Sequence, residues 1–215
     1  ALIIYLILPL VRLGSAFIDS AESLVLLPIY ILLTSSLPWF FLSQQWLLPA
    51  VYSAVLAICA WHIYRKNLSL KEIGFKRNRL PLYILIGTLV GVVLGVVEYF
   101  IITPVAATPS FEITNLLRDL VYMVAFVGLA EEVLFRGLIQ RDMMNLFGWK
   151  WGLIGASLMF GVMHLTWRSI PELGFTMVAG LIFGYLYFRT RSLTAPIVAH
   201  GIANAILVGI MPYLF

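Results

Sequence analysis

The sequence predicts an all-α, polytopic membrane protein of seven to eight transmembrane segments. Of its 215 residues, 62% are hydrophobic and 11% are charged, whereas soluble domains average about 45–50% apolar and about 25% charged residues. The apolar residues form long runs with short connections, and about 20 apolar residues of helix cross a bilayer core of about 30 Å. Helices satisfy their own backbone hydrogen bonds in lipid. With no repeat and no polar linker, a single transmembrane domain over 1–215 is expected.

Each expected membrane helix is an apolar run bounded by polar or turn-forming residues. Residues 1–18 are an eighth candidate, interrupted by Pro9 and Arg12. The other seven expected segments are 24–42, 46–64, 80–103, 116–140, 150–167, 173–190 and 195–214.

Basic residues gather in particular connections and predict the orientation of the chain. The connection 65–79 holds six Lys or Arg residues and one acid, Glu72. Counting spans onward places 141–150 and 189–194, which are also basic, on the same side. Short basic loops face the cytoplasm, so these connections are expected there. The net charge of +4 therefore reflects basic loops beside membrane segments, which set orientation and touch anionic lipid. The predicted partner is the lipid bilayer, and no nucleic acid is expected.

The segment 116–140 contains three ionisable residues, Glu131, Glu132 and Arg136. A charged side chain at the bilayer centre costs about 2.5–3.5 kcal/mol on insertion scales, so such residues are candidates for function. Glu132 and Arg136 are four residues apart and are expected to pair on one helix face. Glu131 is rotated by about 100° from Glu132. It is therefore expected to face a separate pocket as a candidate general base.

Further polar residues lie in two later segments. His200 and Asn204 are one turn apart and offer two hydrogen-bond donors on one face, as stabilisation of an oxyanion requires. His164 follows Phe160 by one turn, so that ring could wall the pocket or stack on the imidazole, and a histidine beside a carboxylate can help to activate water. Singly, a histidine could be a hydrogen-bonded packing residue and a Glu–Arg pair could join helices. Together these residues predict an intramembrane catalytic site.

Three motifs carry a family resemblance. GLAEEVLFRGLI contains E-E-x-x-x-R, MFGVMH contains F-x-x-x-H, and HGIAN contains H-x-x-x-N. In this order they resemble the motifs of the CPBP family, the CAAX proteases and bacteriocin-processing enzymes also called the abortive-infection family. SLKEIGFKR resembles a short element that often precedes that family's core, so the resemblance covers roughly 66–212.

The resemblance implies an intramembrane endopeptidase without a required cofactor, in the inner membrane of a prokaryotic cell. Its substrates would be membrane-associated polypeptides, a class that includes prenylated CAAX proteins. Its site would open toward the cytoplasm. The resemblance assigns roles by position: water activation to Glu131 and His164, the oxyanion to His200 and Asn204, and the shape of the site to Glu132 and Arg136.

Other catalytic and non-catalytic classes stay open at this point. The zinc-protease motif H-E-x-x-H is absent, although His164, His200 and a glutamate could supply a His₂Glu zinc site. Ser157 could serve a serine protease, but both glutamates would then be idle. A proton-coupled transporter would use buried Glu, Arg and His, although no inverted repeat is visible. A non-catalytic scaffold or immunity protein could keep the same residues.

Three further expectations concern the packing and depth of the helices. Glycines recur every four residues near 87–95 and 180–184, a spacing that lets helix backbones approach closely in lipid. Glu98 and His62 are expected at the membrane interfaces. By the predicted boundaries, His164 lies about 21 Å from the cytoplasmic start of its helix, whereas Glu131 lies in the cytoplasmic half. These residues can meet only if a helix is tilted or a boundary is wrong.

Overall fold

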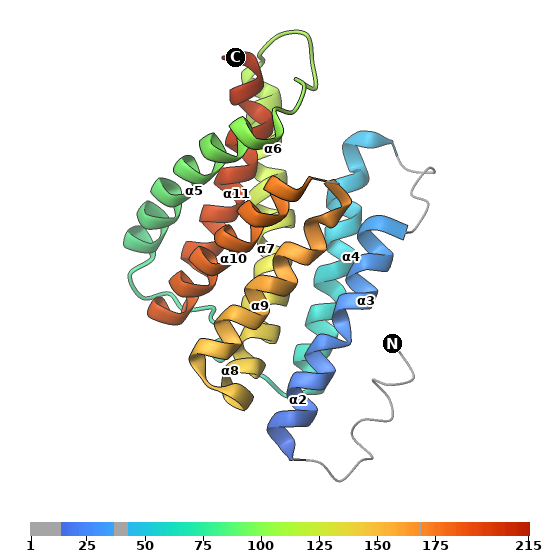
Figure 1. The fold of residues 1–215 in the computed structure, drawn as a ribbon, viewed down its shortest axis with the longest axis vertical. Coiled ribbons are helices and arrows are strands. Elements are labelled where there is room, and N and C mark those ends of the chain that lie inside the picture. Colours follow the sequence, from blue (N-terminus) through green and yellow to red (C-terminus); the bar gives the residue numbers. More distant parts are fainter. Residues whose placement is uncertain (1–13, 37–42, 168) are drawn as a thin grey trace.

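The computed structural model describes residues 14–36, 43–167 and 169–215. Over these residues the chain is a bundle of helices without a strand, which confirms the predicted fold class (Figure 1). Most of the expected eighth segment, 1–18, lies outside the described residues. The α-helices are α2 (Ser15–Leu24), α3 (Leu26–Ile31), α4 (Gln44–Arg65), α5 (Leu80–Ile102), α6 (Ile113–Tyr122), α7 (Leu129–Glu132), α8 (Arg141–Phe147), α9 (Trp149–Met163), α10 (Ile170–Thr190) and α11 (Thr194–Gly209). The π and 3₁₀ segments are η2 (Leu32–Ser36), η3 (Met123–Gly128), η4 (Val133–Gln140), η5 (His164–Trp167) and η6 (Met211–Tyr213).

Six helices among the described residues are long and apolar enough to cross a membrane, so the chain is an integral membrane protein. They are Ser15–Ser35, Trp46–Arg65, Leu80–Ile102, Ile113–Phe147, Ile170–Thr190 and Thr194–Tyr213.

Three of the predicted membrane segments differ from those in the structure, and one of them, expected at 116–140, extends from Ile113 to Phe147. The expected segment 150–167 contains α9, which has 15 residues and ends in the short 3₁₀ helix η5. The segment expected to begin at residue 24 begins at Ser15 in the described part of the chain. Charged residues near its start are tolerated because Glu22 pairs with Arg65 and Lys66 at the end of α4.

The helix Ile113–Phe147 runs through the middle of the bundle. In Figure 1, α2–α4 lie on one side of it, and α5, α10 and α11 lie on the other. Short π-helical stretches, η3 and η4, flank the α-helical turn Leu129–Glu132, and such stretches occur frequently at functional sites. Every residue of η4 is buried. The Glu-Glu pair of the first motif is therefore placed where both halves of the bundle can reach it.

The glycine ladders pack as predicted. A Cβ atom on Gly91 of α5 would lie 2.5 Å from the carbonyl oxygen of Ala199 of α11, so only glycine allows this approach. A Cβ atom on Gly184 of α10 would lie 2.6 Å from Oε1 of Gln140. The Gln140 amide in turn donates to the carbonyl oxygen of Gly184 at 2.9 Å. These close contacts position α10 and α11 against α5 and η4.

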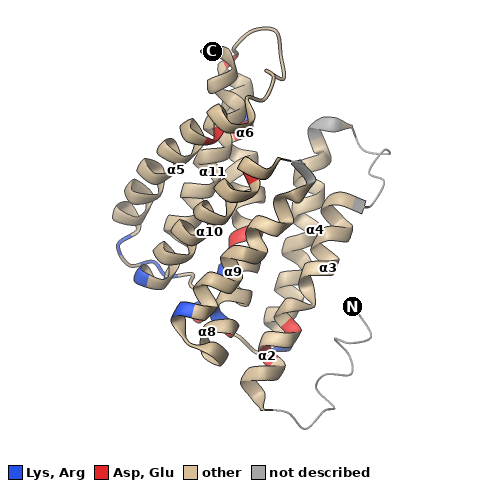
Figure 2. Cartoon of the chain, viewed as in Figure 1, with Lys and Arg blue, Asp and Glu red and all other residues tan. Residues whose placement is uncertain are grey.

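Lys and Arg gather at one end of the bundle. Figure 2 shows them at the connection from α4 to α5, around α8 and at the turn between α10 and α11. The three basic connections predicted to share one side of the membrane therefore lie at the same end of the molecule.

Candidate active site

Two helices bring a charged cluster together in the interior of the bundle. Oε1 of Glu132 accepts a hydrogen bond from Nη1 of Arg136 at 2.8 Å and lies 2.9 Å from Nδ1 of His200. Nη2 of Arg136 donates to the carbonyl oxygen of Gly180 at 3.1 Å. All three ionisable side chains are buried. The predicted pairing of Glu132 with Arg136 is confirmed, and α11 adds His200 to that pair.

Glu131 faces a different set of groups. Its Oε1 accepts hydrogen bonds from the phenol of Tyr30 at 2.6 Å and from the phenol of Tyr52 at 3.0 Å. Its Oε2 is buried without a hydrogen-bond partner among the described residues, and it lies 3.8 Å from Nε2 of His200. One oxygen is therefore held in place, and the other is open toward His200.

The two tyrosines were not predicted from the sequence. They come from α3 and α4, the part of the chain that carries none of the three motifs. The chain has 10 tyrosines, and an apolar helix accommodates a phenol without any visible pattern. No sequence signal singled out Tyr30 or Tyr52, and only the packing of α3 and α4 against α7 reveals them.

Aromatic rings enclose the charged cluster. The ring of Phe183 stacks on the His200 imidazole with centroids 5.3 Å apart, and the ring of Phe160 meets it edge-on at 5.6 Å. The guanidinium carbon of Arg136 lies 4.4 Å from the centroid of Phe160, a cation–π distance. Phe160 also lies 4.7 Å, centroid to centroid, from the ring of His164. The ring of Phe160 therefore lies between the two histidines and contacts both.

His164 and Asn204 meet His200 at a small cavity. The cavity has a volume of about 20 Å³, and Thr176 also lines it. One water molecule needs about 10–15 Å³ measured in the same way, so the cavity has room for a single water. Nδ1 of His164 lies 2.8 Å from the carbonyl oxygen of Phe160. Because a carbonyl oxygen can only accept, Nδ1 carries the hydrogen of this bond. Nε2 of a neutral His164 is then a hydrogen-bond acceptor.

The structure does not join Glu131 directly to His164. Both residues are described, and neither a hydrogen bond nor an ion pair links them. Glu131 reaches the rest of the site through His200 instead. His164 reaches it through the cavity that it shares with His200 and Asn204.

The predicted difference in depth between Glu131 and His164 came from a wrong helix boundary. The helix that carries Glu131 continues to Phe147 and does not end at residue 140. Glu131 thus lies about 24 Å from that end, and His164 lies about 22 Å from the start of α9 at Trp149. The two residues lie at similar depths, because α8 and α9 turn at the same end of the bundle.

Two residues expected at the membrane interfaces are buried. His62 is enclosed at the end of α4. Glu98 is also buried and lines the cavity of His164 and His200. The carboxyl group of Glu172, in the first turn of α10, lies next to that of Glu98. A second acidic pair therefore adjoins the site, and the sequence analysis did not predict it.

The described residues do not bring together three His, Cys, Asp or Glu side chains in an arrangement that could hold a metal ion. The His₂Glu zinc site considered from the sequence has no such geometry here. The Ser157 hydroxyl donates to the carbonyl oxygen of Leu153 in its own helix at 2.7 Å. The serine-protease alternative therefore gains no support.

Comparison with known proteins finds a family similar to part of the chain. The family described as type II CAAX prenyl endopeptidase, Rce1-like, matches residues 113–206, less than half of the chain. This similarity agrees with the resemblance to the CPBP family that the three motifs carry. YpbD of Bacillus subtilis (strain 168), an uncharacterised protein, is 34% identical over 89 residues, which are 40% of this chain and 42% of YpbD. No solved structure matches the chain.

The Rce1-like segment contains all seven residues predicted for the site and runs from α6 to α11. It is shorter than the 66–212 expected from the motifs. Tyr30 and Tyr52, which hold Glu131, lie outside it. The site is therefore assembled from the family segment and from helices that precede it in the chain.

Proposed function

We propose that this protein is an intramembrane endopeptidase that cleaves membrane-associated polypeptides with water activated by Glu131. The supporting observation is the carboxylate of Glu131, which is buried, held at Oε1 by two phenols and open at Oε2 toward His200. A general base needs a defined position and one free oxygen. The similarity of residues 113–206 to a family of CAAX prenyl endopeptidases points to a peptide bond as the target.

In the proposed reaction, Oε2 of Glu131 removes a proton from water as the water attacks the carbonyl carbon of the scissile peptide bond. Nε2 of His164 accepts a hydrogen bond from the same water and orients it. The carbonyl oxygen becomes an oxyanion in the tetrahedral intermediate. Glu131 then returns the proton to the leaving nitrogen as the carbon–nitrogen bond breaks.

His200 and Asn204 are proposed to stabilise the oxyanion. A donated hydrogen bond from Nδ1 of His200 to Glu132 orients the ring, and Nε2–H then donates to the oxyanion together with the amide of Asn204. In this role His200 is an imidazolium, and Glu132 is its counter-ion. Arg136 pairs with the same oxygen of Glu132, so this carboxylate bridges the guanidinium and the imidazole. A protein donor of this kind typically contributes about 10²–10³-fold to kcat.

The same reasoning extends to orientation and substrate. We place the basic end of the bundle in the cytoplasm of a prokaryotic cell, with the protein in the inner membrane. The substrate would be a membrane-associated polypeptide, with CAAX-type C-termini as the class named by the family description. The proposed chemistry requires no cofactor.

The test is cleavage of fluorogenic peptides, prenylated and unprenylated, by the purified protein beside Glu131→Gln. The wild type is expected to cleave, and the variant is expected to lose about 10²–10⁴-fold in kcat, the usual contribution of a general base. Matched thermal unfolding curves would show that both proteins are folded. Equal cleavage by the two folded proteins would contradict the assignment of the base, and no cleavage of any peptide by either would contradict the peptidase.

A further inference from the structure

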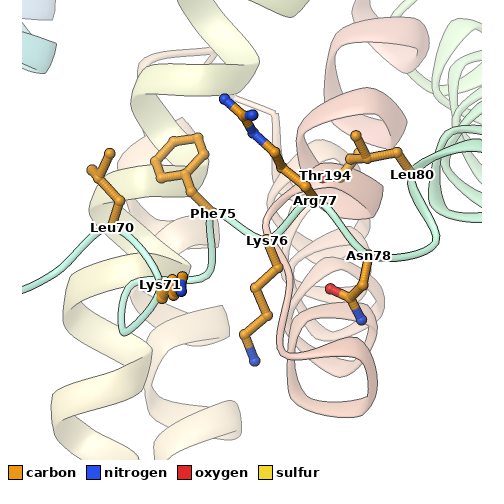
Figure 3. A pocket seen from close by; sticks show the side chains of 8 residues that line it. All are labelled: Leu70, Lys71, Phe75, Lys76, Arg77, Asn78, Leu80 and Thr194. Carbon is orange, nitrogen blue, oxygen red and sulfur yellow. The ribbon is translucent and has the colours of Figure 1, made fainter.

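A second pocket lies at the basic end of the bundle, in the connection between α4 and α5 (Figure 3). Its volume is about 740 Å³, within the range of about 300–1,000 Å³ typical of ligand pockets. Three cations line it, Lys71, Lys76 and Arg77, and no acidic residue does. The pocket is distinct from the cavity of the candidate active site, with which it shares no residue.

The three cations have no anionic partner among the described residues. No ion pair involves Lys71, Lys76 or Arg77, although the chain pairs Lys66, from the same connection, with Glu22 at 2.8 Å. Three unpaired cations around one pocket leave an uncompensated positive field. An anion from outside the chain would compensate it.

The one acid of this connection is already engaged. Oε2 of Glu72 accepts hydrogen bonds from the backbone N–H of Ser69 at 2.6 Å and from its hydroxyl at 2.7 Å. These hydrogen bonds lower the pKa of the Glu72 carboxyl below its usual value. Glu72 therefore caps its own turn, and it neither lines the pocket nor forms an ion pair with the three cations.

The connection is held in one conformation against the α10–α11 junction. The side chain of Ile73 is fully buried, and the N–H of Leu193 donates to the carbonyl oxygen of Gly74 at 2.9 Å. Gly74 has φ +108°, and a Cβ atom there would lie 2.8 Å from the ring of Tyr187. The cations beside this anchor are thus presented by a defined backbone and not by a loose tail.

Of the other residues that line the pocket, Leu70, Phe75 and Leu80 are apolar, and Asn78 and Thr194 are polar. Leu70 is 62% exposed and Phe75 is 37% exposed. In Figure 3, Leu70, Phe75 and Arg77 extend to one side of the connection, and Lys76 and Asn78 extend to the other. Beyond Leu80, the exposed side chain of Leu85 continues the apolar surface along the transmembrane helix α5. A ligand that fits here has a negative head and an apolar tail.

We propose that this pocket binds an anionic phospholipid. The phosphodiester headgroup would contact Lys71, Lys76 and Arg77, and the acyl chains would run along α5. Clusters of Lys and Arg next to a transmembrane helix bind anionic headgroups in this way. The proposal does not depend on peptidase activity, because its test measures lipid binding.

The test is native mass spectrometry of the full chain in detergent, with phosphatidylglycerol or phosphatidylcholine of the same acyl chains. The wild type is expected to retain phosphatidylglycerol in preference to phosphatidylcholine. The triple variant Lys71→Gln/Lys76→Gln/Arg77→Gln is expected to weaken that binding by roughly tenfold or more. The matched control, Lys150→Gln/Arg189→Gln/Arg191→Gln, removes the same charge at the same end of the bundle and is expected to change binding by less than about twofold.

Three results would overturn the proposal. Equal losses in the two triple variants would mean diffuse attraction to the basic end, and equal retention of phosphatidylcholine would mean that the headgroup is not recognised. If free glycerol phosphate displaced phosphatidylglycerol as well as unlabelled lipid does, the pocket would be a site for a water-soluble phosphate and not for a lipid. Thermal unfolding checks that the triple variant is folded, and Lys76→Arg, which keeps the charge, is expected to keep the binding.

Discussion

Glu131 and Glu132 are identical neighbours in the chain, and their surroundings give them different chemistry. Glu132 contacts a guanidinium and an imidazole, so its charge is compensated. Glu131 contacts two neutral phenols and keeps one oxygen without a hydrogen-bond donor. Of the two carboxylates, Glu131 has the freer oxygen to accept a proton. A rotation of about 100° along a helix is enough to separate the two environments.

The tyrosines that hold Glu131 lead to a prediction about catalysis. In Tyr30→Phe/Tyr52→Phe, Oε1 of Glu131 loses both donors and the carboxylate is less well positioned. We expect kcat for peptide cleavage to fall by roughly 10–100-fold with KM little changed, because the lost interaction serves the transition state. The control is Tyr64→Phe on α4, whose side chain is exposed. Unchanged kcat in the double variant would contradict the positioning role.

The Glu132–Arg136 pair leads to a prediction about stability. Removal of one partner of a buried pair leaves an uncompensated charge and costs about 3–5 kcal/mol. Glu132→Gln and Arg136→Met are each expected to lower the unfolding temperature. The double variant is expected to lose less than the sum of the two single variants. Unfolding in mild detergent measures all three, and additive losses would show that the pair is not coupled.

At the scale of elements, the contact of α5 with α11 determines where His200 and Asn204 lie. The carbonyl oxygens of α11 approach the glycines of α5 so closely that no side chain fits between the two backbones. The packing of α3 and α4 against α7 similarly determines where the phenols lie. The candidate site therefore depends on helix positions at two separate contacts, one on each side of the central helix.

The α5–α11 contact can be tested with one methyl group. Gly91→Ala would place a Cβ atom 2.5 Å from the Ala199 carbonyl oxygen, and overpacking of this kind costs about 1–3 kcal/mol. Peptide cleavage and the unfolding temperature are both expected to fall. Gly174→Ala, where no atom lies within 4 Å of the added Cβ, is the control and is expected to be neutral or slightly stabilising. Equal effects at the two sites would contradict the close approach.

At the scale of the whole molecule, the distribution of charge predicts the topology. Cys59 is the one cysteine of the chain and is buried, so a Cys59→Ser background suits labelling with a membrane-impermeant thiol reagent. Lys150→Cys, at the basic end, is expected to react only after the cells are permeabilised. Ser110→Cys, at the other end, is expected to react in intact cells. The reverse pattern would overturn the proposed orientation.

Metal dependence is also a property of the whole molecule. Because the described residues do not arrange three His, Cys, Asp or Glu side chains around a common point, we expect peptide cleavage to survive dialysis against EDTA with a loss of less than about twofold. A loss that added zinc restores would favour the His₂Glu alternative. A loss that zinc does not restore would indicate damage to the protein by the treatment.

The sequence by itself determined the fold class, the approximate spans and the pairing of Glu132 with Arg136, because these depend on composition and on spacing along one helix. It predicted the helix boundaries less well. Residues 141–147 extend the central helix although Arg141, Asp142 and Asn145 are polar, because this part of the helix packs against α2 and α9. This extension brought Glu131 and His164 to similar depths.

Only the tertiary structure decided which residues from distant helices meet. The phenols of Tyr30 and Tyr52 on Glu131, the burial of Glu98 beside Glu172, and the anchoring of the α4–α5 connection all depend on contacts between segments far apart in the chain. No periodicity along one helix records such contacts, because in lipid an apolar helix face is equally compatible with acyl chains and with another helix. Packing decides whether a helix face contacts lipid or another helix. It does so through close approach at glycines and through hydrogen bonds that form only in the assembled bundle.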